Sequence, residues 1–243
     1  MEPTDNVRRE WAARVEAEYR SAAITQHLTL WLIQLGASPD LIRDGLRITD
    51  DELVHAEMAF ATLTAAGGSL AGPFDRATLG LRRDPTVSLE VDVALAVAEV
   101  FCLGETVAVP LFSALRAGCT VPVAREALDR VLVDEVRHRD FGWTALTWLL
   151  DHGLAELRPS VSAALPAMFA RQRRNYGVGA PAGGALSPAE IAWGLMDLPR
   201  YAATLEATLD RQYIPRFERL GIDAAAAWRG TPGGAVGVVP STS

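Results

Sequence analysis

The 243-residue sequence contains no lysine, so all 23 of its basic side chains are arginines. This absence excludes chemistry that needs a lysine amine, such as a Schiff base with a carbonyl substrate or the lysine of a Walker-type phosphate loop. The 30 acidic residues outnumber the arginines and leave a net charge of −7. Because a phosphate binder normally shows a basic face, we expect no nucleic-acid partner.

Cysteine is scarce as well. Cys102 and Cys119 are too few and too far apart for a zinc site or a redox pair, and nothing indicates a disulfide framework. The N-terminus is polar and acidic, unlike a signal peptide, and the apolar runs are interrupted before they reach membrane-spanning length. The sequence therefore predicts a cytoplasmic protein without a membrane partner.

Alanine and leucine dominate the composition, which favours helix over strand. Apolar residues recur at helical spacing and predict four long helices, over residues 7–35, 39–66, 88–117 and 122–151. Ser38 is a suitable N-cap for the second helix, with Pro39 at its first position. Residues 67–87 hold glycines and prolines without a period and are expected to form a long connection.

The two halves of this region are alike, since each consists of a long helix, a tight turn with proline and a second long helix. Two such hairpins joined by a crossover have the topology of a ferritin-like four-helix bundle, so the predicted fold class is all-α with this bundle over residues 1–153. Residues 154–228 are expected to add two or three shorter helices, one of them starting at the capping sequence Ser187-Pro188-Ala189-Glu190. Residues 229–243 are expected to form a flexible tail.

The most informative motif is Asp-Glu-x-x-His, which occurs at residues 51–55 and again at residues 134–138. Residues three apart on a helix point to nearly the same side, so each motif presents a carboxylate and an imidazole together. Both motifs lie deep within predicted helices, on stripes of apolar residues. A buried carboxylate is costly unless something compensates its charge, and two such pairs that face each other could be compensated by metal ions.

A dinuclear carboxylate site needs one further glutamate from each of the other two helices. Glu105 meets this need on the third helix and is expected to stand level with Glu135, because the two lie equally far along the chain from the turn between their helices. On the first helix the candidate is Glu18, although its level differs from that of Glu52 by about one helical turn. Glu16, on the face of His27, is the competing residue.

The candidate metal ligands, which are also the candidate catalytic residues, are Glu18, Glu52, His55, Glu105, Glu135 and His138. Metal-bound histidine usually donates its other N–H to a carboxylate. Asp51 and Asp134 each precede a candidate ligand histidine by four residues, and each is expected to bond the histidine of the opposite helix. The alternatives are two solvated aspartates and a metal-free bundle with buried His–Glu pairs.

This pattern resembles the ferritin-like di-iron carboxylate superfamily. The segments "CLGET" and "DEVRHRDFGW" are similar to a group of bacterial ferritin-like domain proteins, and the likeness covers about residues 10–150. The resemblance implies that the six candidate ligands bind two iron ions. The doubled Asp-Glu-x-x-His is similar to the oxygen-activating hydroxylase and desaturase branches, in which the aspartates support the ligand histidines.

Four carboxylates balance the charge of two divalent ions, and an oxygen-rich ligand set suits iron, manganese or a mixed Mn/Fe pair better than a soft metal. We expect an O₂-activating non-haem di-iron oxygenase or oxidase that acts on a small organic substrate, with specialised metabolism as one setting. O₂ would be the co-substrate, and an external electron donor a partner.

Two further functions are alternatives. The first is ferroxidase, iron-storage or peroxide-scavenging activity, and the second is a metal-free helical scaffold. The added helices of residues 154–228 argue against simple storage, because they can cap the bundle and shape a substrate cavity, or else form a homodimer interface. A tRNA hydroxylase of similar architecture is disfavoured by the acidic charge.

Three residues near the proposed site have local consequences. Ala59 and Gly142, each seven residues after a motif glutamate, leave room either for a pocket or for close helix packing. Pro110, about one turn after Glu105, should free a backbone carbonyl and kink its helix. Cys102 is expected to be a small buried residue rather than a ligand.

Overall fold

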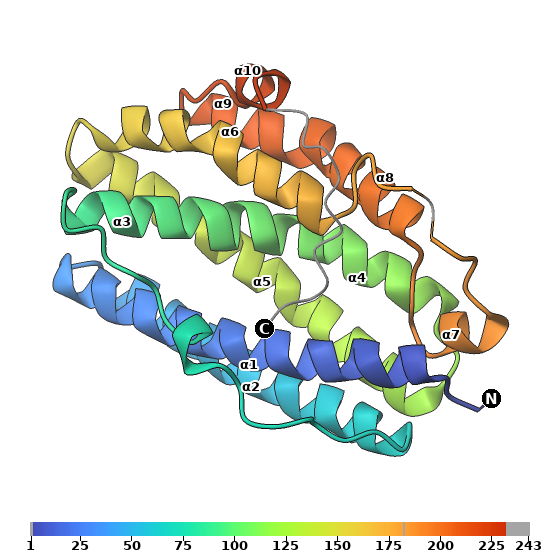
Figure 1. The fold of residues 1–243 in the computed structure, drawn as a ribbon. Coiled ribbons are helices and arrows are strands. Elements are labelled where there is room, and N and C mark those ends of the chain that lie inside the picture. Colours follow the sequence, from blue (N-terminus) through green and yellow to red (C-terminus); the bar gives the residue numbers. More distant parts are fainter. Residues whose placement is uncertain (1, 182, 232–243) are drawn as a thin grey trace.

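The computed structural model describes residues 2–181 and 183–231, and within these ranges every regular element is a helix and none is a strand. The predicted all-α class is therefore confirmed. Residues 232–243, most of the predicted tail, lie outside the described residues. The described residues form a helical bundle. Its N-terminal hairpin lies on one side, and most of the C-terminal helices lie on the other (Figure 1).

The N-terminal hairpin consists of α1 (Asp5–Gln34) and α2 (Pro39–Ala65). Ser38 caps α2 by accepting a hydrogen bond from the backbone N–H of Leu41, and Pro39 occupies the first turn. Gly36 has a φ of 73°, a left-handed conformation that glycine adopts without a steric penalty, and this allows the chain to reverse within a few residues.

The second hairpin pairs a rod of three segments with α5 (Pro122–His152). The rod consists of α3 (Leu89–Ala96), the π-helical η2 (Val97–Glu105) and α4 (Thr106–Gly118). The helix predicted over 88–117 is therefore correct in extent, but its central part is π-helical rather than α-helical. The wider turns of a π-helix rotate the residues that follow it, and such segments are frequent at functional sites. Pro110 is accommodated within α4.

Gly142 of α5 determines how closely the two helices of this hairpin approach. A β-carbon at Gly142 would lie 2.5 Å from Phe101 Cβ and 2.9 Å from the Phe101 carbonyl carbon. Gly142 is therefore a close-packing position, which is the second of the two interpretations of this residue. Cys102 is fully buried at the same contact, as expected.

The crossover between the hairpins, residues 66–88, includes the short helix η1 (Arg76–Thr78) and runs along α1 (Figure 1). The backbone N–H of Leu81 donates to Nδ1 of His27 at 3.0 Å, and the His27 ring packs edge-on against Trp31. His27 thus serves to hold the crossover.

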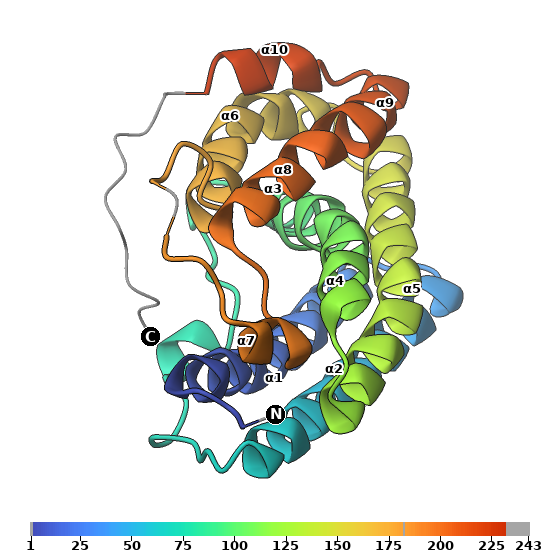
Figure 2. The ribbon, with the colours of Figure 1, turned by 90° about the vertical axis from the view of Figure 1, so that its right-hand side faces the viewer.

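The C-terminal segment contains more helices than the two or three expected, namely α6 (Leu157–Asn175), α7 (Pro188–Ala192), α8 (Leu198–Thr208), the π-helical η3 (Leu209–Tyr213), α9 (Ile214–Arg219) and α10 (Ala224–Arg229). Ser187 and Glu190 form the predicted capping box at α7. Apart from α7, these helices cover the side of the α3–α4 rod that faces away from α1 and α2 (Figure 2). Tyr213 donates its hydroxyl to the Leu103 carbonyl of η2 at 2.6 Å, and Phe217 packs on Trp143.

Among the described residues, one helix, Leu89–Gly118, is long and apolar enough to cross a bilayer by length and composition. This differs from the expectation that the apolar runs are too short, because valine, alanine and leucine outweigh the few acidic residues along this helix. A core helix passes the same test. Phe101 and Leu103 of this rod are fully buried between the other helices, so the finding is weak evidence for a membrane span.

We predict that Gly142→Ala destabilises the protein by about 1–3 kcal/mol, because the added methyl group overpacks the contact with Phe101. Gly104→Ala is the matched control, since a β-carbon there would meet only the Glu99 carbonyl oxygen, at 3.8 Å. Urea unfolding of the two variants measures the difference. Equal midpoints for the two variants would show that the close approach at Gly142 is not required.

Candidate metal centre

Four helical segments bring the six predicted side chains to one place. His55 Nδ1 lies 3.9 Å from Glu18 Oε2 of α1 and 3.4 Å from Glu52 Oε2 of α2. His138 Nδ1 lies 3.4 Å from Glu52 Oε1 and 3.9 Å from Glu135 Oε2 of α5. Glu105, the last residue of η2, joins Glu52 and His138 in a group whose potential ligand atoms all lie within 4.8 Å of one another.

The level of Glu18 follows from the hairpin register. Glu18 precedes Gln34, the end of α1, by as many residues as His55 follows Pro39, the start of α2. The one-turn offset along the helices is therefore real and sets Glu18 level with the histidine of the motif, although the Glu18 side chain also comes within 4.8 Å of Glu52. Ser21 is the residue level with Glu52, and its hydroxyl donates to Glu52 Oε1 at 2.8 Å.

Two groups in this cluster could each hold a cation, and they share one residue. The first comprises Glu18, Glu52 and His55, and the second comprises Glu52, Glu105 and His138. Glu52 belongs to both groups and is only 1% exposed, so it is the residue that two ions would share. Glu135 is in neither group as the side chains lie, although it is buried beside His138 and Glu105.

Four buried polar atoms of the cluster have no hydrogen-bond partner: Glu52 Oε2, His55 Nδ1, Glu135 Oε2 and His138 Nδ1. Buried polar groups are nearly always hydrogen-bonded, so each such atom needs an explanation. These four belong to residues that face one another in the same cluster. Cations there would give every one of them a partner, so the residues present fit a two-metal centre.

The spacing also suits metal ions. Histidine nitrogen and carboxylate oxygen bind a divalent metal at about 2.1 Å, which puts adjacent ligand atoms about 3 Å apart and opposite ones about 4.2 Å apart. The nitrogen-to-oxygen distances of 3.4 Å and 3.9 Å fall between these values. The potential ligand atoms within each group lie at most 4.8 Å apart, so the widest pair would have to approach by only about half an ångström to bind one ion.

The two aspartates occupy the outer side of the histidines. His55 Nε2 lies 3.2 Å from Asp134 Oδ2, and His138 Nε2 lies 3.3 Å from Asp51 Oδ2. Each bond crosses between α2 and α5, as the motif spacing predicts. A donor Nε2–H leaves Nδ1 deprotonated in the neutral ring and free to bind a metal.

The charges in the cluster are strongly coupled. Burial, together with the charge of Glu52, raises the pKa of Glu105 to about 7, and burial with Glu105 raises the pKa of Glu135 well above its ordinary value. Burial would also raise the pKa of Glu52, but its close contacts with His138 and His55 lower it. Burial opposes the protonation of His138, yet the bond to Asp51 and the nearby carboxylate of Glu52 raise its pKa to about 10. Without cations, protons thus supply the compensating charge.

The remaining candidate residues do not join the cluster. Glu16 belongs to neither metal-binding group found in the described chain. His152, in the last turn of α5, bonds the Trp148 carbonyl at 3.0 Å. Only the two motif histidines therefore face the carboxylates.

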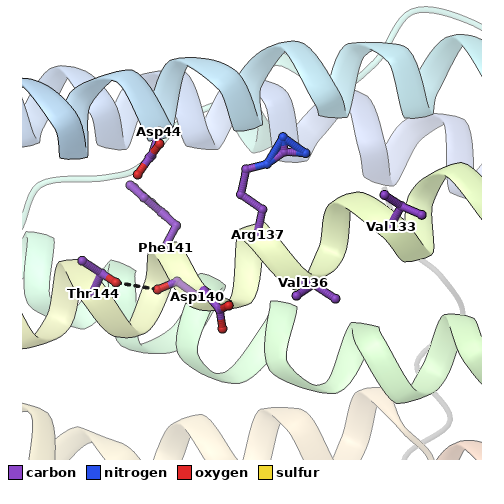
Figure 3. Close-up of a pocket in the computed structure, with 7 residues that line it drawn as sticks. All are labelled: Asp44, Val133, Val136, Arg137, Asp140, Phe141 and Thr144. Carbon is purple, nitrogen blue, oxygen red and sulfur yellow. Dashed lines mark hydrogen bonds between the residues drawn. The ribbon is translucent and has the colours of Figure 1, made fainter.

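A small cavity adjoins the first metal group and is lined by Ala59, Glu18, His55, Arg14 and Phe112, among others. The small side chain at Ala59 thus does leave space, although the cavity has room for only about one water molecule. A separate surface groove runs along the outer face of α5 from Val133 to Thr144 (Figure 3).

Sequence reasoning missed Ser21, Arg130 and Arg137. Ser21 could have been found from the hairpin register, because it lies as far before the end of α1 as Glu52 lies after the start of α2. The two arginines lie four residues before and three residues after Asp134, spacings that place ion pairs on one helix face. Burial, opposed by these arginines and His55, leaves Asp134 with a pKa of about 2.

No protein-family model matches the chain, and no curated protein or solved structure matches it either.

We predict that metal binding strengthens as the pH rises from about 6 to about 8 and releases protons. Affinity should rise with pH because Glu105 holds a competing proton below its pKa of about 7. His138, with a pKa of about 10, also holds a proton that a cation has to displace. Calorimetric titration of the apo-protein with Mn²⁺ in two buffers of different ionisation enthalpy measures the released protons. Glu105→Gln should bind less tightly and show a flatter pH dependence. Affinity that is constant with pH would contradict the assignment.

Proposed function

We propose that this chain is a ferritin-like non-haem di-iron oxygenase or oxidase that activates O₂ and acts on a small organic substrate. The observation that carries the proposal is the convergence of four glutamates and two histidines from four helical segments, with four of their buried polar atoms lacking a partner. Hard oxygen ligands with two imidazoles suit iron or manganese.

The ligands divide into those that would hold one ion and one that would be shared. Glu18 and His55 would hold one ion, Glu105, His138 and Glu135 the other, and Glu52 would bridge both. If these residues held two ferrous ions, the pair would supply the electrons for O₂ reduction. The protein residues set the spacing of the pair, and the surrounding apolar helices exclude bulk water from it.

The C-terminal helices favour an enzyme over a storage protein. They contribute side chains to the same hydrophobic core as the bundle, and burial together with Tyr201, Glu105 and Glu135 raises the pKa of Tyr176 at the end of α6. The Tyr213 hydroxyl of η3 also donates to the Leu103 carbonyl, two residues before Glu105, so the C-terminal helices reach the segment that carries this candidate ligand. A segment in this place is suited to shape a substrate site beside Glu105.

We predict that the protein binds about two metal ions per chain after iron supplementation. Substituting different candidate ligands should remove different numbers of these ions. Glu52→Gln should lose both ions, because both groups use this residue. Glu18→Gln and Glu105→Gln should each lose mainly one ion, while Glu16→Gln, on the same helix as Glu18 but outside both groups, should lose none. Elemental analysis and Mn²⁺ titration measure the stoichiometry.

Three results would separate the proposed function from its alternatives. O₂ consumption and product formation by iron-loaded protein with a reductant and candidate substrates supports the oxygenase. A very large assembly on size-exclusion chromatography, with iron oxidation but no organic product, supports a ferroxidase or storage protein. Metal content far below two ions per chain in iron-supplemented wild type supports a metal-free scaffold.

A further inference from the structure

Two arginines of α5 lie over the outer side of the cluster and connect its two halves. Arg130 is bonded to Asp134 through Nε and lies 3.4 Å from Asp51 Oδ1 through Nη2. Arg137 Nη2 lies 2.7 Å from Asp134 Oδ1 and 3.4 Å from Asp51 Oδ2. Each arginine therefore contacts both aspartates, and the four side chains form a closed ring between α2 and α5.

The ring is continuous with the candidate ligands. Asp51 bonds His138 and Asp134 bonds His55, while the Nδ1 atoms of the two histidines face the glutamates. Each aspartate thus has a histidine on its inner side and two arginines on its outer side. A guanidinium group has several donors in a fixed plane, which allows one arginine to bond two carboxylates at once.

We propose that Arg130 and Arg137 are shared positioning residues that fix both Asp–His pairs together and thereby couple the two metal positions. The proposal rests on the proposed two-metal site. Without the arginines, the carboxylates of Asp51 and Asp134, which are almost fully buried, would lose the bonds that fix their orientation, and both histidines would lose a fixed Nε2 acceptor. Because each arginine contacts both aspartates, the loss of either one affects both histidines.

The charges of the ring and of the candidate ligands would balance those of two divalent ions. Four glutamates, two aspartates, two arginines and two divalent ions sum to zero when both histidines are neutral. The arginines neutralise the two aspartates, and the metal ions neutralise the four glutamates. The arginine side chains remain about two-fifths exposed, so that their own charge stays hydrated.

Charge and position predict opposite effects, and this makes the proposal testable. An arginine that acted only through its charge would repel the cations, so its removal would tighten metal binding. An arginine that positions the Asp–His pairs would weaken binding when it is removed. Loss of a group that orients a ligand histidine typically costs about 10- to 100-fold in metal affinity.

The experiment is a calorimetric titration of the apo-protein with Mn²⁺, together with a Co²⁺ titration followed by visible absorption. We expect Arg130→Gln and Arg137→Gln each to weaken both metal positions by about tenfold or more and to change the Co²⁺ spectrum. Arg139→Gln is the matched control, because Arg139 is also on α5 but pairs with Asp140, and it should leave both affinities and the spectrum unchanged.

The lysine variants separate charge from geometry and also serve if a glutamine variant does not fold, as judged by far-UV circular dichroism. Arg130→Lys and Arg137→Lys keep the charge but lose the planar fork, so they should weaken both positions as well. Unchanged or tighter binding in the arginine variants would overturn the proposal, as would a loss confined to one position or a full rescue by lysine. Absence of metal binding in the wild type would instead refute the proposed function.

Discussion

The structure depends on one electrostatic constraint, which is the burial of several carboxylates against two imidazoles in the middle of a helical bundle. A buried charge without compensation costs several kcal/mol, and like charges in contact add to this cost. Glu52, Glu135 and the two histidines are each at most 2% exposed. The protein therefore needs positive charge at this place, in the form of protons when no metal is bound and of cations otherwise. This need favours a metal centre over a structural network of hydrogen bonds, since hydrogen bonds alone leave Nδ1 of both histidines without a partner.

The fold meets this constraint through helix register. The turn at Gly36 sets Glu18 level with His55 and Ser21 level with Glu52, while the turn between α4 and α5 sets Glu105 level with Glu135. The π-helical η2 ends at Glu105, so the face that this glutamate presents is determined by the wider turns before it. Gly142 then permits α5 to lie against η2 at Phe101. Local backbone features distant from the carboxylates thus determine where the carboxylates meet.

The helical class, the two hairpins and the six residues of the cluster could be predicted from the sequence. The helical period of the apolar residues and the position of each turn are local features, and counting from the turns indicates which glutamates lie near the two Asp-Glu-x-x-His motifs. The sequence was not sufficient for the π-helix, since a π-turn depends on packing that involves Phe101, Gly142 and Tyr213 from three distant segments. The membership of Glu52 in both groups also depends on how the two hairpins dock, which no spacing within one helix reveals. Arg130 and Arg137 resembled ordinary surface charges, because their role depends on Asp51 of another helix.

The carboxyl groups of the cluster differ in how readily they hold a proton. Glu52 has a lowered pKa and accepts a hydrogen bond from Ser21, and Nδ1 of each motif histidine lies 3.4 Å from one of its oxygens, so this carboxylate is fixed in place before any cation enters. Burial and neighbouring carboxylates raise the pKa of Glu18, Glu105 and Glu135 instead. A cation that entered either group would therefore compete with protons on these residues. The C-terminal segment reaches the rod that carries Glu105, since the Tyr213 hydroxyl donates to the Leu103 carbonyl. It also reaches α1, because Arg14, which lines the small cavity beside Glu18, donates to the Gly194 carbonyl. The segment that distinguishes this chain from a bare four-helix bundle therefore supports helices on both sides of the cluster.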